Sequence, residues 1–311
     1  MSTKRTILIL GLLGIALLTG CASDGSADGD GRLKVVATIG QIGNAAEIIG
    51  GEHISVTSLM GAGVDPHLYV ATESDVSRLA EADIIFYNGL FLEAQMDDIL
   101  QQIGERKTAV PIGETVDEAL LLGSPIYADE HDPHIWFDVL LWSEAIQAIR
   151  DTLVEMDPAN AADYEANTAA YLDELQALHE YVEQQAARLE PEQRILITAH
   201  DAFNYFGRRY GFEVLGLQGI STQSEAGTAD VRELAALIVE RQVPAVFIES
   251  SVPVRNVEAL QEAVEAQGHA VEIGGSLFSD AMGNPGTFEG SYIGMVTHNI
   301  DTIVGALLEN K

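Results

Sequence analysis

The sequence predicts an α/β protein of two lobes, each with a mainly parallel sheet covered by helices, joined by one long rigid α-helix. Two observations support this fold class. From residue 33 onward, short apolar runs rich in β-branched residues alternate with amphipathic helical patterns, which is typical of parallel sheets. Residues 157–191 break this alternation with an uninterrupted helical pattern that contains no glycine, and we interpret this segment as the connection between the lobes.

Residues 1–20 have the features of an export signal. Lys4 and Arg5 precede an apolar run at 7–18, which is shorter than the ~20 residues that a membrane-spanning helix needs. The run ends in Leu-Thr-Gly-Cys, and Cys21 is the only cysteine, so no internal disulfide can form. This stretch resembles a bacterial lipobox, in which the cysteine is lipidated and becomes the first residue of the mature chain. An ordinary signal followed by an incidental thiol is the alternative.

The mature chain is strongly acidic. Residues 21–32 are small and polar, as in a flexible tether, and the remaining ~280 residues suit one large domain or two of moderate size. The net charge is −32, and removing residues 1–20, which hold two cations and no anion, makes it −34. A charge of this sign excludes nucleic acid as a partner and raises the local concentration of cations. We predict an exported protein, held by lipid at the outer face of the cell membrane or at a membrane facing the periplasm.

The two lobes are expected at residues 33–156 and 192–311. Short apolar runs predict strands at 33–39, 54–59, 83–88, 109–112, 194–199, 212–217 and 245–250. Apolar positions at helical spacing predict helices at 72–82, 92–103, 138–156, 226–241 and 254–267.

The linking helix is predicted over residues 157–191. Asp157 has the position of a cap, and Pro158 stands at the first helical position. Apolar and aromatic side chains follow at three- or four-residue spacing or its multiples: Tyr164, Tyr171, Leu175, Leu178, Val182 and Leu189. Such a helix would be on the order of 45 Å long, more than the diameter of one small domain. A buried helix of a single larger domain is the alternative to a strut between lobes.

Four side chains are candidate metal ligands, and all lie in connections near the ends of predicted strands. The sequence Asp-Pro-His-aliphatic-aromatic occurs twice, and its proline stiffens the turns that present His67 and His134. His200 directly follows a predicted strand, and Asp280 lies in a Gly-rich loop. Ligands of open α/β sheets bind outside the carboxyl ends of the strands. If the two lobes face each other, each lobe would therefore contribute two of these side chains to a shared cleft.

Three imidazoles and one carboxylate suit a first-row divalent ion, which leaves zinc, manganese and ferrous iron as candidates. The set lacks the thiolates of a copper(I) or iron–sulfur site, and it is too rich in nitrogen for calcium or magnesium. His131 is a weaker, auxiliary candidate. The other histidines are expected to be structural or at the surface: His53, His179, His269 and His298.

Six segments resemble the metal-binding lipoproteins of bacterial manganese/zinc ABC importers, in the order of that family. They are DPHLY (65–69), DPHIWFD (132–138), ITAHDAFNYF (197–206), LQGISTQSEAG (217–227), VFIESSV (246–252) and LFSDAMG (277–283). The resemblance covers almost all of the mature chain. It implies two α/β lobes joined by one long helix, with a metal held between them by His67, His134, His200 and Asp280. It also implies a receptor without catalytic activity, which delivers manganese or zinc to an ABC permease and its ATPase.

Two departures from the family pattern concern the choice of metal. Zinc-specialised members usually have a long loop rich in histidine and acid before the second ligand, whereas residues 123–134 form a short stretch with one extra histidine. Some manganese-specific members have glutamate at the place of His200. A set with three histidines should bind zinc at least as tightly as manganese, yet HDAFNYF and GLQGIST look most like members assigned to manganese uptake. The physiological ion stays open among manganese, zinc and iron.

Two carboxylates are candidates for supporting the ligands. Asp138 and Glu249 have positions from which a carboxylate could accept the second ring N–H of a ligand histidine and so fix its tautomer. Glu249 could instead be a fifth ligand, and each of the two could instead be a surface or cap carboxylate.

Two other classes of protein are alternatives to a receptor. A zinc hydrolase needs an open coordination position and a separate acid or base, and the chain contains neither an HExxH motif nor a nucleophile elbow. A surface adhesin would fit the lipid anchor and a role in cell adhesion, but it explains none of the metal-type residues.

Overall fold

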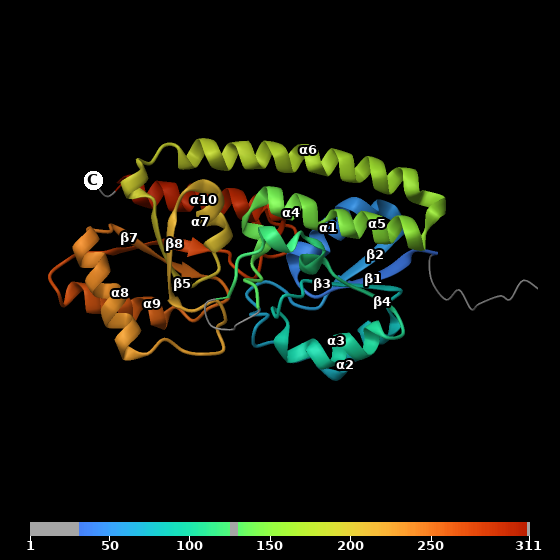
Figure 1. The fold of residues 1–311 in the computed structure, drawn as a ribbon, viewed down its shortest axis with the longest axis horizontal. Coiled ribbons are helices and arrows are strands. Elements are labelled where there is room, and N and C mark those ends of the chain that lie inside the picture. Colours follow the sequence, from blue (N-terminus) through green and yellow to red (C-terminus); the bar gives the residue numbers. More distant parts are fainter. Residues whose placement is uncertain (1–30, 125–129, 310–311) are drawn as a thin grey trace, which may run out of the picture. The chain divides into compact units, whose positions relative to one another are not determined.

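Two groups of parallel strands, separated in sequence by the long helix, form the centre of the fold (Figure 1). The computed structural model describes residues 31–124 and 130–309. The predicted signal at 1–20, Cys21 and nearly all of the predicted tether lie outside the described residues. Among those that are described, no helix has both the length and the apolar character that crossing a bilayer requires.

The first lobe contains a four-stranded parallel sheet in the order β2-β1-β3-β4. Its strands are β1 (Leu33–Ala37), β2 (Ile54–Ser58), β3 (Ile84–Tyr87) and β4 (Thr108–Pro111). The helices of this lobe are α1 (Gly40–Gly50), α2 (Glu73–Glu81), α3 (Asp97–Gly104), α4 (Val139–Ala145) and α5 (Gln147–Met156). The four strands predicted in this lobe are all present.

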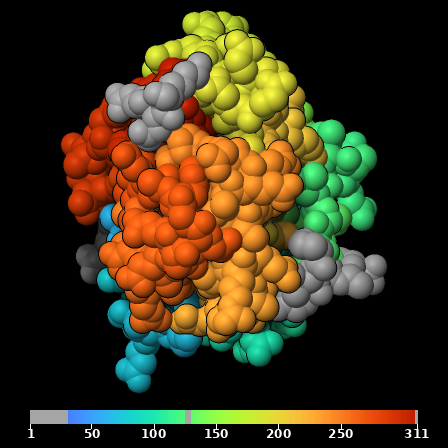
Figure 2. Space-filling view, turned by 90° about the vertical axis from the view of Figure 1, so that its left-hand side faces the viewer, coloured from blue at the N-terminus to red at the C-terminus, as the bar shows by residue number. Residues whose placement is uncertain are grey.

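The second lobe contains two parallel pairs, β5 with β6 and β7 with β8, and β5 lies beside β7. The strands are β5 (Ile195–His200), β6 (Glu213–Gln218), β7 (Ala245–Glu249) and β8 (Glu272–Leu277). The helices are α7 (Asn204–Tyr210), α8 (Thr228–Arg241), α9 (Arg255–Glu265) and α10 (Tyr292–Glu309). Figure 2 shows the face on which α8 and α9, in orange, form the surface below the yellow end of the long helix.

The long helix α6 (Ala161–Ala186) has 26 residues and follows one 3₁₀ turn, Pro158–Asn160. It is shorter than the predicted range, and Asp157 does not cap it: the Asp157 carboxylate accepts hydrogen bonds from the Asn160 amide and the Tyr164 hydroxyl. The apolar and aromatic side chains predicted at helical spacing are all buried, although Leu189 lies beyond the end of α6.

Helix α6 contacts helices of both lobes, namely α1, α4 and α5 of the first and α7 and α10 of the second (Figure 1). One buried apolar cluster includes Val36 of β1, Tyr171 of α6 and Leu196 of β5. The helix therefore connects the lobes, and its buried face is also part of a core that both lobes share.

Four elements were not predicted from the sequence: α1, α7, α10 and β8. Helix α1 begins and ends with glycine, which is a poor helix former. Its Gly43 packs closely against β2, where a Cβ atom would overlap the Ser58 hydroxyl. In β8, Gly274 packs tightly against Phe247 and Ala306, and Gly275 has a φ of +147°. Glycines replace the β-branched residues by which a strand is usually recognised.

Candidate metal centre

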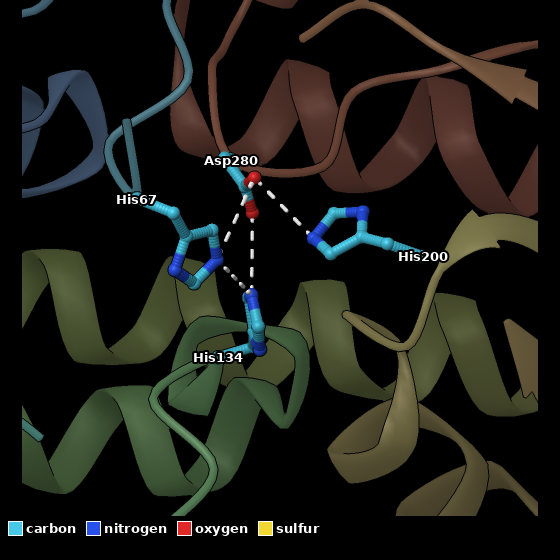
Figure 3. A group of neighbouring side chains, drawn as sticks. All are labelled: His67, His134, His200 and Asp280. Atoms are coloured by element: carbon cyan, nitrogen blue, oxygen red, sulfur yellow. Dashed lines mark hydrogen bonds and ion pairs between the residues drawn. The ribbon is translucent and has the colours of Figure 1, made fainter. Parts of the chain in front are cut away.

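The structure brings the four predicted ligands together (Figure 3). His67 lies in the turn after β2, and His134 directly precedes the short 3₁₀ helix Ile135–Phe137. His200 is the last residue of β5, and Asp280 lies in the loop after β8. One ligand atom from each side chain lies within 4.8 Å of all the others, and no residue of the four is more than 2% exposed.

The distances between the ligand atoms suit a small cation. The Nε2 atoms of His67 and His134 are 3.3 Å apart, and the Asp280 carboxylate lies 3.4 Å from His134 Nε2 and 3.3 Å from His200 Nε2. A tetrahedron of ligands about 2.0–2.1 Å from a zinc ion has edges of about 3.3–3.4 Å. Within the described part of the chain, His200 Nε2 and both Asp280 carboxylate oxygens are buried without a hydrogen-bond partner. A bound cation would satisfy His200 Nε2 and one of the two carboxylate oxygens directly.

The repeated Asp-Pro-His motif has a structural explanation. In both copies the aspartate accepts the backbone N–H of the histidine two residues later, at 2.9 Å between Asp65 and His67 and at 3.0 Å between Asp132 and His134. The proline between them removes a competing donor and restricts the turn. Each motif is therefore a small rigid unit that presents one imidazole.

The two copies differ in what else the aspartate binds. Asp132 Oδ1 also accepts from the ring Nδ1 of His134 at 2.7 Å, which directs Nε2 of that ring into the site. Asp65 instead uses its second oxygen to accept a 2.6 Å hydrogen bond from Thr222 Oγ1 in the second lobe. The first copy thus joins the lobes, and the second orients its ligand.

Glu249 lies where the sequence placed a supporting carboxylate. Its Oε2 accepts from Nδ1 of His200 at 2.6 Å, and its Oε1 accepts the His200 backbone N–H at 2.9 Å. Both oxygens are occupied by His200, so the geometry fits a supporting group better than a fifth ligand.

Asp138 is a helix cap, which was the alternative to a carboxylate that supports a ligand histidine. Its carboxylate caps α4 by accepting the backbone N–H groups of Leu140 and Leu141, and it forms a 2.8 Å ion pair with Arg209. The carboxylate beside His134 is Asp132, since a residue two positions earlier in the tight turn can reach both the backbone and the ring. The aspartate of the repeated motif was the signal that could have identified it.

The buried carboxylates and imidazoles of the site shift one another's pKa values. Burial disfavours the charged imidazoles, but Asp132 and Asp280 outweigh it and raise the pKa of His134 to about 9. Glu249 and Asp280 likewise raise the pKa of His200 well above its usual value against the effect of burial. Burial would raise the pKa of Asp280, but these two histidines hold it well below the usual range. In the absence of a cation, protons on the imidazoles therefore balance the carboxylates.

His67 differs from the other two imidazoles, because burial lowers its pKa to about 3 and keeps it neutral. It also lines a cavity of about 460 Å³ together with Phe91, Pro133 and Gln223. His131 lines the same cavity but does not belong to the four-ligand group. The cavity therefore lies directly beside the His67 side of the site.

This fold and this site define a class of protein, the two-lobed α/β proteins that hold a metal ion between their lobes with buried histidines and a carboxylate. The chain belongs to the family described as zinc-uptake complex component A, periplasmic, which it matches over residues 35–306. The family resemblance inferred from the six sequence segments is thereby confirmed, as is the predicted fold class.

Relatives with curated names cover nearly the whole chain. The sequence is 50% identical over 299 residues to the zinc-binding protein TroA of Treponema pallidum, covering 95% of this chain and 96% of TroA. It is 46% identical over 291 residues to the manganese-binding lipoprotein MntA of Bacillus subtilis, covering 93% of this chain and 95% of MntA. The solved structure of the Treponema pallidum protein superposes with a TM-score of 0.87 over 89% of this chain and 99% of that one.

Proposed function

We propose that this protein is the extracytoplasmic receptor of an ABC importer, which captures a divalent transition-metal ion and delivers it to a membrane permease and its ATPase. The observation that carries the proposal is the group of four buried ligand atoms between two lobes. The names of its relatives support the same role, since one is a zinc-binding protein and another a manganese-binding lipoprotein.

The ligands in this proposal are His67, His134, His200 and Asp280, with Asp132 and Glu249 orienting two of the rings. The cargo is zinc or manganese, and three imidazoles favour zinc at least as strongly as manganese in vitro. A hydrolase would need a coordination position open to water, whereas Asp280 completes a four-ligand set here. We therefore propose binding and release without catalysis.

The site is tested by metal analysis of the mature protein and by titration of the metal-free form. One zinc or manganese ion should bind per chain, and His67→Ala and Asp280→Ala should each weaken binding severely, because each removes one of four ligands. If either variant binds the metal within a few-fold of the parental affinity, the substituted residue is not a ligand. His298→Ala, at a half-buried ring outside the four-ligand group, is the matched control and should bind normally.

The membrane anchor is a separate part of the proposal. Acyl chains on Cys21 would hold the receptor beside its permease, and the relative from Bacillus subtilis is named a lipoprotein. Cys21→Ala should move the protein from the membrane fraction to the soluble fraction and abolish incorporation of labelled fatty acid. Cellular uptake of radioactive manganese and zinc, with and without the protein, would then identify the physiological cargo.

A further inference from the structure

A fully buried glutamine of the first lobe contacts the loop that carries Asp280. Gln41 lies in the first turn of α1 and has no exposed surface. Its Nε2 donates to the backbone carbonyl of Asp280 at 3.1 Å and to that of Ser279 at 3.4 Å. The indole N–H of Trp136, also in the first lobe, donates to the same Ser279 carbonyl at 3.1 Å.

These contacts fit the chemistry of a primary amide. A buried carbonyl needs a donor, and leaving one unpaired is destabilising. The two N–H groups of one amide can serve two carbonyls without adding a charge beside Asp280. The amide oxygen of Gln41 is itself buried and lacks a hydrogen-bond partner among the described residues. Its donor groups are therefore the part of the side chain that the structure uses.

The two carbonyls belong to the peptide groups on either side of the Asp280 Cα atom. Holding both peptide planes fixes the backbone dihedral angles of Asp280 and hence the direction of its Cα–Cβ bond. The carboxylate oxygens themselves have no hydrogen-bond partner in the described structure. The aim of this ligand toward the histidines therefore depends on its backbone.

The second lobe holds the same loop at slightly earlier positions. Asn299 binds both backbone groups of Phe278, and the Ser279 hydroxyl lies 3.0 Å from that of Ser251. Gln41 thus links the Asp280 backbone to the lobe that contributes His67 and His134.

We propose that Gln41 is a positioning residue for metal binding, which aims the Asp280 carboxylate at the two histidines of the first lobe. The proposal rests on the proposed role of Asp280 as a ligand, and it assigns a function to a side chain outside the ligand set. Gln41 does not touch the metal in this arrangement.

A double-mutant cycle on the full mature chain tests this role. Gln41→Met keeps the length and packing of the side chain but removes both donors. It should weaken zinc binding by about 10–100-fold, the usual range for groups that orient a ligand. In an Asp280→Ala background the same substitution should change the affinity by less than about threefold, since no carboxylate is left to aim. Gln261→Met, in α9, is the matched control. It removes a hydrogen bond from a glutamine amide to the Val271 backbone carbonyl, and it should leave zinc affinity unchanged.

The zinc affinities of these variants distinguish a positioning role of Gln41 from a purely structural one. An equal loss of affinity in both backgrounds would show a general structural role and overturn the proposal, as would no loss in the parent background. Asp280→Ala binding zinc as tightly as the parent would instead overturn the ligand assignment. If Gln41→Met does not fold, Gln41→Leu serves in the same cycle, and thermal unfolding of each metal-free variant establishes that folded proteins are compared.

Discussion

Glu249 accepts two hydrogen bonds from one residue, His200: the ring Nδ1–H at 2.6 Å and the backbone N–H at 2.9 Å. The carboxylate therefore fixes both the position of the ligand and the tautomer that leaves Nε2 free for a cation.

Replacing this carboxylate should weaken metal binding without removing a ligand. For Glu249→Gln we expect a loss of about 10–100-fold in zinc affinity, because the neutral amide makes the imidazole a weaker and less well oriented donor. Competition with a chromophoric chelator measures the change.

Asp138→Asn is the matched control for this prediction. It should lower the free energy of unfolding by about 1–3 kcal/mol, because it removes the carboxylate charge that pairs with Arg209, while zinc affinity stays the same. If Glu249→Gln binds zinc as tightly as the parent, Glu249 does not orient His200. If Asp138→Asn loses as much zinc affinity as Glu249→Gln, Asp138 is not only a helix cap.

Metal binding should release protons. In the metal-free protein at neutral pH, His134, with its pKa raised to about 9, and His200, with its pKa also raised, carry protons that a cation must displace. We expect the release of about two protons per ion near pH 7 and an affinity that increases with pH up to about 9. Calorimetric titrations in buffers of different ionisation enthalpy count the protons. A constant affinity between pH 8 and 5 would argue against imidazole ligands.

The stability of the metal-free protein should depend on pH in a different way. The raised pKa of His134 contributes stability that is complete below its unfolded value of about 6.5 and is lost as the pH rises through about 9. The lowered pKa of His67, about 3, contributes stability above about pH 6.5 that is lost as the pH falls toward 3. Urea unfolding should therefore show the largest free energy of unfolding near pH 6.5, and a maximum at pH 9 would contradict these shifts.

The contact between Asp65 and Thr222 should slow the departure of the metal. This 2.6 Å hydrogen bond to a carboxylate joins the His67 turn to the second lobe. Thr222→Val keeps the shape of the side chain but removes the donor, and it should increase the dissociation rate by about 10-fold, as expected for a hydrogen bond to a charged group. Stopped-flow mixing of the loaded protein with excess chelator measures the rate. Ser221→Ala, in the same loop, should dissociate like the parent.

Selectivity should depend on His200. Replacing its imidazole by a carboxylate in His200→Glu changes a set of three nitrogens and one carboxylate into one of two nitrogens and two carboxylates. Oxygen ligands suit manganese better than zinc, so the ratio of zinc to manganese affinity should fall by at least about 10-fold. Competition between the two metals at one site measures this ratio directly. An unchanged ratio would mean that the shape of the site, rather than its donors, sets the preference.

Local patterns in the sequence account for much of the fold and the site. Seven strands were predicted close to their observed places because each is a short apolar run. The repeated Asp-Pro-His motif indicated two members of the buried four-residue group, because a proline beside a histidine restricts the turn that presents it. The remaining elements and contacts depend on packing between residues that are distant in the sequence, which local patterns do not reveal. Helix α1 and strand β8 depend on glycines that fit against distant side chains, such as Gly43 against Ser58. The contact of Gln41 with Asp280 joins residues 239 positions apart.

The position of α6 between the lobes has a consequence for the thermal unfolding of the protein. A protein with two lobes often unfolds in two steps. Here side chains of β1, α6 and β5 share one apolar cluster, while a second cluster lies within the second lobe, between its strands and α8 and α9. Unfolding of either lobe therefore removes part of the larger core on which the other also depends. Scanning calorimetry should show a single endotherm whose van't Hoff and calorimetric enthalpies agree. The receptor would then be either wholly intact or wholly unfolded, and no half-folded form would expose two of the four ligands to scavenge metal outside the cell.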